Sequence, residues 1–271
     1  MYRLLAKGIG MMSVAALLCA CGHDEKPLFE MLKADQTGIS FSNQPAANDS
    51  LNILDYLYYY NGGGVAVGDI NNDGLTDIYF TANRKEANRL YLNKGNFVFE
   101  DITAKSGTAG LADWHSGATM ADVHGDGWLD IYVCAVSGKL GLQGRNQLFI
   151  NNRNGTFTDS AVAYGLDFSG FSTQAAFFDY DRDGDLDCYL LNQSAHSVEM
   201  YRDTSLRRVP GGAAGDVLLR NEGNRFTDVT REAGIYNSIL GYGLGLAIAD
   251  FNNDGWDDIY IGNDFHENDY Y

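Results

Sequence analysis

Four short segments of the chain combine carboxylates, an amide or imidazole, and glycine at one spacing. The first, DINNDGLTD, runs from Asp69 to Asp77, with polar side chains at its first, third, fifth and ninth positions and glycine at its sixth. The pattern recurs as DVHGDGWLD from Asp122, DYDRDGDLD from Asp179 and DFNNDGWDD from Asp250. Carboxylates this close repel one another unless a cation lies among them. Oxygen donors at alternating positions suit Ca²⁺, which takes about 6–8 oxygen ligands. We therefore predict a calcium site in each loop, up to four ions in all.

The predicted ligands are the side chains at positions one, three, five and nine and the backbone carbonyl at position seven. In chain order they are Asp69, Asn71, Asp73, Leu75 and Asp77; Asp122, His124, Asp126, Trp128 and Asp130; Asp179, Asp181, Asp183, Asp185 and Asp187; and Asp250, Asn252, Asp254, Trp256 and Asp258. Because neutral imidazole is a poor ligand for a hard cation, we expect the site containing His124 to be weaker, water-bridged or empty. The alternative for any single loop is an Asx-rich turn without metal.

Other metal-binding classes fit the loops less well. An EF-hand needs a glutamate at position twelve and helices on both sides. Position twelve is Phe80, Val133, Leu190 or Ile261, and the flanking residues have strand-like patterns. Mg²⁺ prefers a rigid octahedron and keeps its waters, and zinc would require Cys or His ligands. Calcium remains the best match.

The loops lie in a repeat of four predicted strands. Each loop follows one apolar run and precedes another, and a second pair of runs then flanks an Asn/Gly turn, beginning at Asn88, Asn146 and Asp216. Such an array of short strands predicts an all-β fold, a β-propeller made of four-stranded blades. A β-sandwich with regular turns is the alternative. The final residues, from Asn268, match only the start of the second pair, so we expect about four blades of a longer propeller, truncated at its C-terminal end.

The N-terminal residues predict export and lipid attachment. Arg3 and Lys7 precede an apolar run that is too short to span a bilayer, and Leu18-Cys19-Ala20-Cys21 resembles a bacterial lipobox. Residues 1–21 are therefore expected to be a lipoprotein signal peptide, with Cys21 as the lipidated residue; an ordinary signal peptide is the alternative. The resulting protein would be an outer-membrane lipoprotein of the cell envelope, exposed at the surface if the early acidic residues act as an export signal.

Residues 22–50 form a predicted linker before the partial propeller of residues 51–271. Within this linker, FEMLKADQTGISF from Phe29 is similar to the end of a blade, FTDVTREAGI from Phe226, and is a candidate closing strand. Two cysteines of the mature chain, Cys134 and Cys188, lie in apolar runs and are expected to be small buried residues rather than a disulfide.

The loops and their lead-ins resemble FG-GAP/VCBS repeats of the integrin-α type. The segments YNGGGVAVGDINNDGLTDIYFTAN, STQAAFFDYDRDGDLDCYLLN and YGLGLAIADFNNDGWDDIYIGNDFHENDYY resemble proteins of the ASPIC/UnbV type, which are similar to cartilage acidic protein. The resemblance implies a seven-bladed propeller with calcium in the strand-linking loops, followed in the family by an ASPIC/UnbV region that this chain lacks.

Charge and motifs favour a binding module over an enzyme. A formal net charge of −17 argues against a nucleic-acid partner, which would need a basic face. No nucleophile elbow, P-loop or dinucleotide fingerprint occurs in the sequence. We expect a non-catalytic, calcium-stabilised binding or scaffold lipoprotein with a protein or glycan ligand. The alternative is a polysaccharide lyase or hydrolase whose site, lined by residues such as Tyr59, Tyr60, His196 and Arg202, lies on the propeller face.

Overall fold

A computed structural model describes residues 27–45, 47, 49–83, 87–138, 140–194, 203–223, 225–264 and 267–271. The predicted signal peptide and Cys21 lie outside these ranges. The chain divides into a first unit, Met1–Leu32, and a second, Lys33–Tyr271, which contains every helix and strand reported below. None of the helices in the described ranges has the length and apolar character needed to cross a bilayer.

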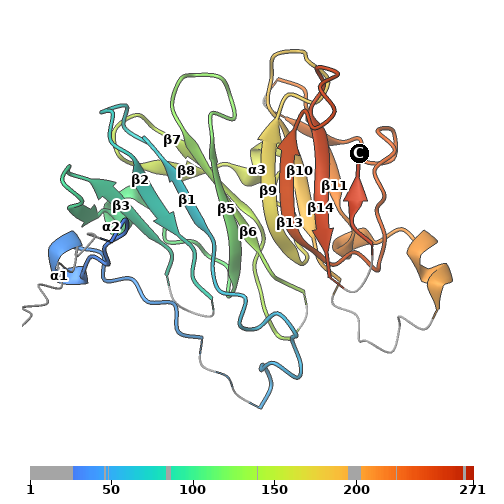
Figure 1. Cartoon of the computed structure of the whole chain (residues 1–271), viewed down its shortest axis with the longest axis horizontal. Coiled ribbons are helices and arrows are strands. Elements are labelled where there is room, and N and C mark those ends of the chain that lie inside the picture. The colour runs from blue at the N-terminus through green and yellow to red at the C-terminus, as the bar shows by residue number, and fades with distance from the viewer. Residues whose placement is uncertain are drawn as a thin grey trace, which may run out of the picture. The chain divides into compact units, whose positions relative to one another are not determined.

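Four antiparallel sheets follow one another along the second unit, and we number them as blades one to four (Figure 1). Blade one contains β1 (Val65–Gly68), β2 (Asp77–Phe80), β3 (Arg89–Asn93) and β4 (Phe99–Asp101); blade two contains β5 (His115–Ala121), β6 (Asp130–Ala135), β7 (Gln147–Asn151) and β8 (Phe157–Asp159); blade three contains β9 (Ser172–Phe178), β10 (Asp187–Asn192), β11 (Val217–Asn221) and β12 (Phe226–Asp228); and blade four contains β13 (Gly243–Ala249), β14 (Asp258–Asn263) and β15 (Asp269–Tyr270). Strand order within each sheet follows chain order. The prediction of a β-propeller built from such blades is confirmed.

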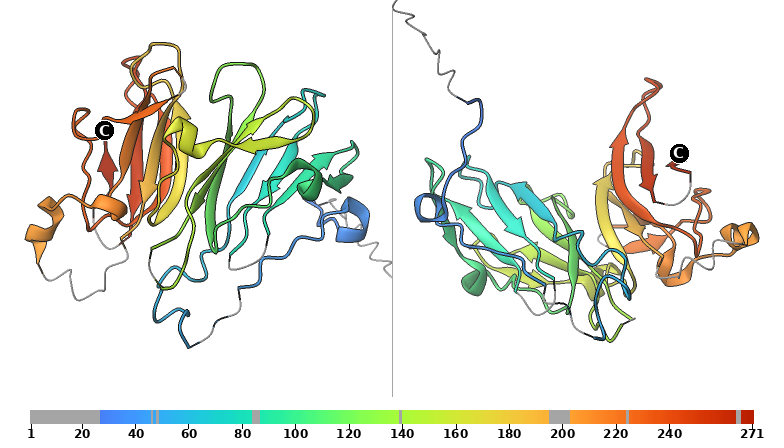
Figure 2. Two further views of the ribbon diagram at one scale, coloured as in Figure 1. Left: turned by 180° about the vertical axis from the view of Figure 1, so that it is seen from behind. Right: turned by 60° about the horizontal axis from the view of Figure 1, so that its bottom comes forward.

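The first strand of each blade lies next to the first strand of the following blade. β1 contacts β5, β5 contacts β9, and β9 contacts β13, so these four strands form the inner edges of the sheets. Isolated bridges reinforce each junction, joining Asn83 to Trp114, Val136 to Phe171 and Gln193 to Tyr242. The inner strands approach so closely that a Cβ on Gly117 would lie 2.5 Å from the carbonyl oxygen of Thr173. Figure 2 shows the succession of sheets from two further directions.

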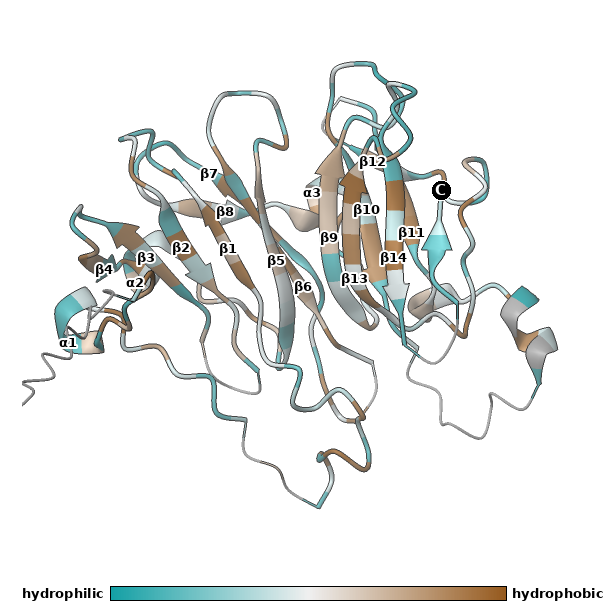
Figure 3. Cartoon of the chain, in the orientation of Figure 1, coloured by the Kyte–Doolittle hydropathy of each residue, from teal (hydrophilic) through white to brown (hydrophobic). Residues whose placement is uncertain are grey.

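The core lies between the blades. Tyr79 and Ile131 pack between blades one and two, Cys134 and Cys188 between blades two and three, and Tyr189 and Ile261 between blades three and four. Both faces of a blade are covered in this arrangement, which explains why every residue of β6 and β10 is buried. Figure 3 shows the apolar residues concentrated along the strands. Both cysteines are free and buried, as predicted.

Short helices follow the outer strands and end at left-handed glycines. α2 (Thr103–Ser106) ends at Gly107 and α3 (Ala161–Tyr164) at Gly165, with φ of 77° and 73°. The same unit occurs near the N-terminus, where α1 (Ala34–Thr37) ends at Gly38 with φ 77°. Two 3₁₀ helices, η2 (Thr204–Arg208) and η3 (Gly212–Ala214), lie in the long connection between β10 and β11.

The glycine ending α1 contacts blade one as the glycine ending α3 contacts blade three. A Cβ on Gly38 would lie 2.4 Å from the carbonyl oxygen of Phe99, and one on Gly165 would lie 3.0 Å from that of Phe226. Each of these phenylalanines begins the outer strand of the blade that follows in the chain. Residues 34–38 therefore occupy, next to blade one, the position that the end of a preceding blade would occupy. Residues 28–33 form no strand, and the closing strand stays a prediction.

Candidate metal-binding loops

The four acidic loops occupy one position in the repeat. Each begins directly after the inner strand of its blade, and its ninth residue is the first residue of the next strand: Asp77 in β2, Asp130 in β6, Asp187 in β10 and Asp258 in β14. Since the strands on either side are paired in register, each loop closes a hairpin between the two innermost strands of a blade.

All four loops share one backbone conformation, with left-handed residues at positions four and six. Position six is always glycine, with φ between 83° at Gly74 and 98° at Gly184. Position four is Asn72, Gly125, Arg182 or Asn253, with φ between 57° and 69°. Glycine adopts this region without steric cost, and asparagine tolerates it better than most residues. The glycine at position six therefore lies where the left-handed backbone favours it.

The carboxylate at position one holds the loop closed. Asp69 accepts the backbone N–H of Asp73 at 3.1 Å and that of Gly74 at 2.7 Å. Asp122, Asp179 and Asp250 accept the equivalent pairs of N–H groups in the other three loops. Position five adds a smaller turn: Asp73, Asp126, Asp183 and Asp254 each accept the N–H two residues later, at 2.8–2.9 Å. These bonds direct the side chains at positions one and five inward.

The carboxylate at position nine is buried, and its hydrogen bonds link the second strand, to which it belongs, with the start of the loop and with the third strand. Asp187, 1% exposed, accepts the N–H of Tyr180 at 3.0 Å and that of Asn221 at 2.8 Å. Asp77 and Asp130 accept the matching N–H groups of their own blades. Position nine therefore joins the loop to the third strand, whether or not it also binds metal.

The third loop gathers the most negative charge. One carboxylate oxygen each from Asp179, Asp181 and Asp187 lies within 4.8 Å of the other two. Oxygens that surround one Ca²⁺ at about 2.3–2.6 Å can lie this far apart. Burial, reinforced by the charges of Asp181 and Asp183, raises the pKa of Asp187 to about 6. A bound cation would relieve both effects, so the donor set of this loop fits calcium.

Blade two departs from this pattern because an imidazole within its loop and an arginine from another turn of the blade lie against its carboxylates. The His124 ring places Nδ1 3.0 Å from Asp130 and Nε2 3.0 Å from Asp126. Arg153, in the turn between β7 and β8, donates through Nε to Asp126 at 2.8 Å and also through a terminal nitrogen. Burial opposes ionisation of Asp126, but the Arg153 hydrogen bond leads the effects that hold its pKa below the usual value. Although His124, Asp122 and Asp130 converge, these contacts do not fit a calcium ion.

Three asparagines not recognised as site residues connect the loops to the sheets. Asn93, Asn151 and Asn221 end the third strands, and each donates its side-chain amide to the backbone carbonyl at position eight of its own loop. Asn151 also donates to the carbonyl of Ile70 at 2.8 Å, which is position two of the loop in blade one. Asn221 likewise donates to the carbonyl of Val123 at 3.4 Å, which is position two of the loop in blade two. The recurring asparagine at the end of each third strand was the available sequence signal.

Neighbouring loops also touch directly through position four. Asn72 donates to the carbonyl of Gly127 in the next loop at 3.0 Å, and the Arg182 guanidinium lies 3.7 Å from the ring centroid of Trp256. Gly125 has no side chain for such a contact. Through position four, the loop of blade one therefore contacts that of blade two, and the loop of blade three contacts that of blade four.

Of the four residues suggested for a catalytic face, the structure describes Tyr59 and Tyr60, whose ring centroids lie 4.9 Å apart. Tyr59 is fully buried, whereas Tyr60 is 65% exposed. His115 is buried at the start of β5, and burial lowers its pKa to about 4. His196, Arg202 and His266 lie outside the residues that the structure describes.

Comparison with known proteins supports the repeat assignment. The family of FG-GAP-like repeats matches residues 69–133 and 135–190. Cartilage acidic protein 1 of Xenopus tropicalis is 31% identical over 206 residues, covering 75% of this chain and 29% of that protein. Integrin alpha-8 of Gallus gallus is 31% identical over 142 residues, covering 47% of this chain and 14% of that protein. This chain thus spans less than a third of either relative.

A solved structure with a similar chain trace is a lectin of Agrocybe aegerita that specifically recognises non-reducing terminal N-acetylglucosamine. It shows 18% sequence identity, covers 72% of this chain and 45% of its own, and has a TM-score of 0.37. A likeness at that score carries no inference about this chain.

Proposed function

We propose that this chain, which contains FG-GAP-like repeats and is related to cartilage acidic protein 1 and integrin alpha, is part of a non-catalytic binding or scaffold protein stabilised by calcium. The observation that carries the calcium proposal is the convergence of Asp179, Asp181 and Asp187 in a loop whose conformation recurs in all four blades. Calcium would supply the positive charge that these carboxylates lack, and it would link the two strands of the inner hairpin in each blade that binds it.

The proposed sites are the loops of blades one, three and four. Their carboxylates at positions one and five have no side-chain cation among their hydrogen-bond partners within the described ranges. In blade two, the Arg153 guanidinium supplies positive charge at Asp126, and the His124 ring lies against Asp126 and Asp130. Three calcium ions per chain, rather than four, are therefore expected.

Calcium titration of the metal-free protein tests this proposal. Calorimetry should give a stoichiometry of three, and excess EGTA should lower the melting temperature of the calcium-loaded protein. A ligand at about 100 times its dissociation constant stabilises a protein by about 2.7 kcal/mol per site. For a domain of this size, each kcal/mol corresponds to roughly 2–4 °C. Identical melting curves in saturating calcium and in EGTA would overturn the proposal.

We also propose attachment to the outer membrane through a lipid on Cys21, supported by the sequence Leu18-Cys19-Ala20-Cys21 after a short apolar run. Cys21→Ser should move the protein from the membrane to the soluble envelope fraction, and Cys19→Ser, two residues earlier, should leave it in the membrane. Equal membrane retention of both variants would rule out the anchor without affecting the calcium proposal.

A further inference from the structure

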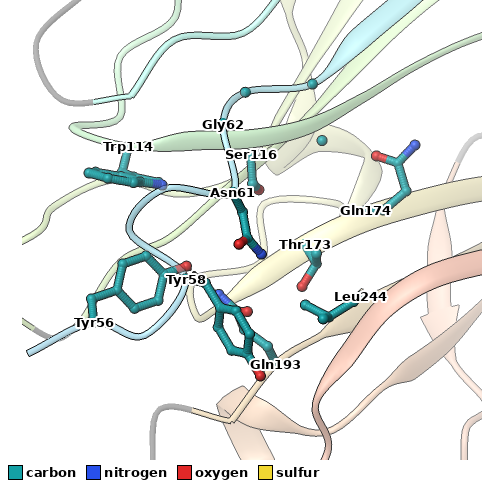
Figure 4. A pocket seen from close by; sticks show the side chains of 13 residues that line it. Tyr56, Tyr58, Asn61, Gly62, Trp114, Ser116, Thr173, Gln174, Gln193 and Leu244 are labelled. Carbon is teal, nitrogen blue, oxygen red and sulfur yellow. Dashed lines mark hydrogen bonds between the residues drawn. The ribbon is translucent and has the colours of Figure 1, made fainter. Parts of the chain in front are cut away.

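A cavity of about 440 Å³ lies where the inner strands of the blades begin. The segment that precedes β1 forms one side, through Tyr56, Tyr58 and Asn61. The opposite side consists of residues that begin β5, β9 and β13, namely Ser116, Thr173 and Leu244 (Figure 4). The volume lies within the range of small-molecule sites, about 300–1,000 Å³.

The cavity is assembled from equivalent positions of all four blades. Gly63, Ser116, Thr173 and Leu244 each stand six residues before the first aspartate of their acidic loop. Strand residues advance by about 3.3 Å, so the cavity and the acidic loops lie at opposite ends of the inner strands, roughly 20 Å apart. A ligand in the cavity would therefore not share atoms with the proposed calcium sites.

The lining is uncharged, in contrast to the chain as a whole. Its polar groups include the amides of Asn61, Gln174 and Gln193 and the hydroxyls of Ser116 and Thr173. Aromatic side chains also line the cavity. No Asp, Glu, Lys, Arg or His lines the cavity within the described part of a chain whose net charge is −17. An anionic ligand would meet no basic partner there and would be repelled by the acidic protein. A cationic ligand would find no carboxylate in the lining.

Two polar atoms at this cavity lack a partner. Gln193 is 2% exposed; its amide nitrogen donates to the Tyr56 hydroxyl, but its Oε1 accepts no hydrogen bond. The buried Oγ1 of Thr173 also has no partner. Figure 4 shows both side chains beside the same space, with Asn61 nearby. Unpaired buried acceptors are unfavourable, and an apolar ligand would leave them so, whereas ligand hydroxyls can donate to them.

We propose that this cavity binds an uncharged, hydroxyl-rich ring ligand, namely a neutral sugar residue of a glycan. The inference rests on the proposed binding function and specifies its ligand and site. Sugar hydroxyls can donate to Gln193 and Thr173 and accept from the Asn61 amide. The apolar face of the ring can lie against Tyr58.

The test uses the whole chain, calcium-loaded, and a panel of neutral saccharides matched with sulfated and uronate-containing ones. Saturable binding of a neutral saccharide is expected. Asn61→Trp changes an exposed residue into the type found at the equivalent position of blade two, Trp114, and should block the cavity and abolish binding. Asn61→Ala removes the amide assigned to the sugar and should weaken binding by about tenfold, the effect of one lost hydrogen bond. Asn152→Ala removes an exposed amide outside the cavity and should bind like the unaltered protein.

Each variant is first compared with the unaltered protein by its melting curve in calcium. If Asn61→Trp melts normally and still binds the neutral saccharide, the cavity is not the site. Preference for acidic saccharides, or binding of a peptide that Asn61→Trp blocks, would overturn the ligand class. If no saccharide binds while EGTA still lowers the melting temperature, this inference fails and the calcium proposal stands. If EGTA has no effect either, both fail.

Discussion

Arg153 donates two hydrogen bonds from its guanidinium to the carboxylate of Asp126, and its Nε lies 2.8 Å from Oδ2. Arg153 has a left-handed backbone, with φ 61°, at the turn position that Gly95 and Gly223 occupy in blades one and three. A non-glycine residue in this region costs free energy. Blade two thus has an unfavourable turn residue together with a side chain that neutralises its own acidic loop.

Removing both the His124 imidazole and the Arg153 guanidinium should create a calcium site in blade two. The double variant His124→Asn, Arg153→Gly places asparagine at position three of the loop, as in blade four, and glycine at the turn between β7 and β8, as at the equivalent turns of blades one and three. Calorimetry should then show one additional calcium ion per chain. Arg225→Gly removes an arginine from the corresponding hairpin of blade three and should leave the stoichiometry unchanged. Equal stoichiometry of the double variant and the unaltered protein would show that Arg153 does not substitute for the ion.

Asp183→Ala should destabilise the calcium-loaded protein more than His124→Ala. Asp183 is a predicted ligand at position five of the third loop, where it also accepts the N–H of Asp185 at 2.9 Å. Loss of one site should lower the melting temperature by roughly 5–10 °C. In His124→Ala, Arg153 still neutralises Asp126, so the change should be smaller. The reverse order in saturating calcium would contradict our ranking of the sites.

Asn151→Ala should weaken the junction between blades one and two. Its amide donates to the carbonyls of Ile70 and Leu129, at 2.8 and 3.1 Å, in a buried setting. Loss of partners for buried groups costs about 1–3 kcal/mol in the free energy of unfolding, measurable by urea denaturation. Asn93→Ala is the matched control, because the Asn93 amide donates to the carbonyl of Thr76 in its own exposed loop, and its Oδ1 accepts the N–H of Gly95 just as that of Asn151 accepts the N–H of Arg153. Equal losses in both variants would mean that the contact between blades contributes nothing.

Asp216 should make stability depend on pH. Blades one and two have Asn88 and Asn146 at this position, donating to buried tyrosines, whereas the Asp216 carboxylate accepts from Tyr189 at 3.0 Å. Burial raises the pKa of Asp216 from 3.8 to about 7. Since the folded state holds the proton more tightly than the unfolded state, this contribution to stability is complete below pH about 4 and is lost as pH rises to about 7.

Asp216→Asn should remove that loss. Its free energy of unfolding, measured in saturating calcium, should rise relative to the unaltered protein between pH 4 and 7, by roughly 4 kcal/mol at most, since one pKa unit corresponds to about 1.4 kcal/mol. The reciprocal change, Asn146→Asp, should introduce the same dependence in blade two. Parallel stability curves for all three proteins would contradict the pKa of Asp216.

The sequence by itself determined the repeat, the blades and the conformation of the acidic loops. These features depend on neighbours in the chain: apolar runs pair across the loop, Gly74 and its equivalents allow the left-handed turn, and Asp69 bonds to N–H groups four and five residues later. Such short-range geometry is readable from spacing because one residue type at one offset is sufficient to produce it. The buried character of Cys134 and Cys188 followed from their apolar runs in the same way.

The sequence singled out the second loop through His124, but only the tertiary structure showed that Arg153 lies against that loop and where the cavity forms. Arg153 donates a hydrogen bond to Asp126, 27 residues earlier in the chain, and Asn151 donates one to the carbonyl of Ile70, 81 residues earlier. The cavity joins the segment before β1 to the starts of three later strands. These contacts arise because radial packing brings equivalent positions of successive blades together. No local periodicity in the sequence specifies which residues of different blades come into contact. A side chain that neutralises a loop, or lines a cavity, therefore cannot be identified until the blades are packed.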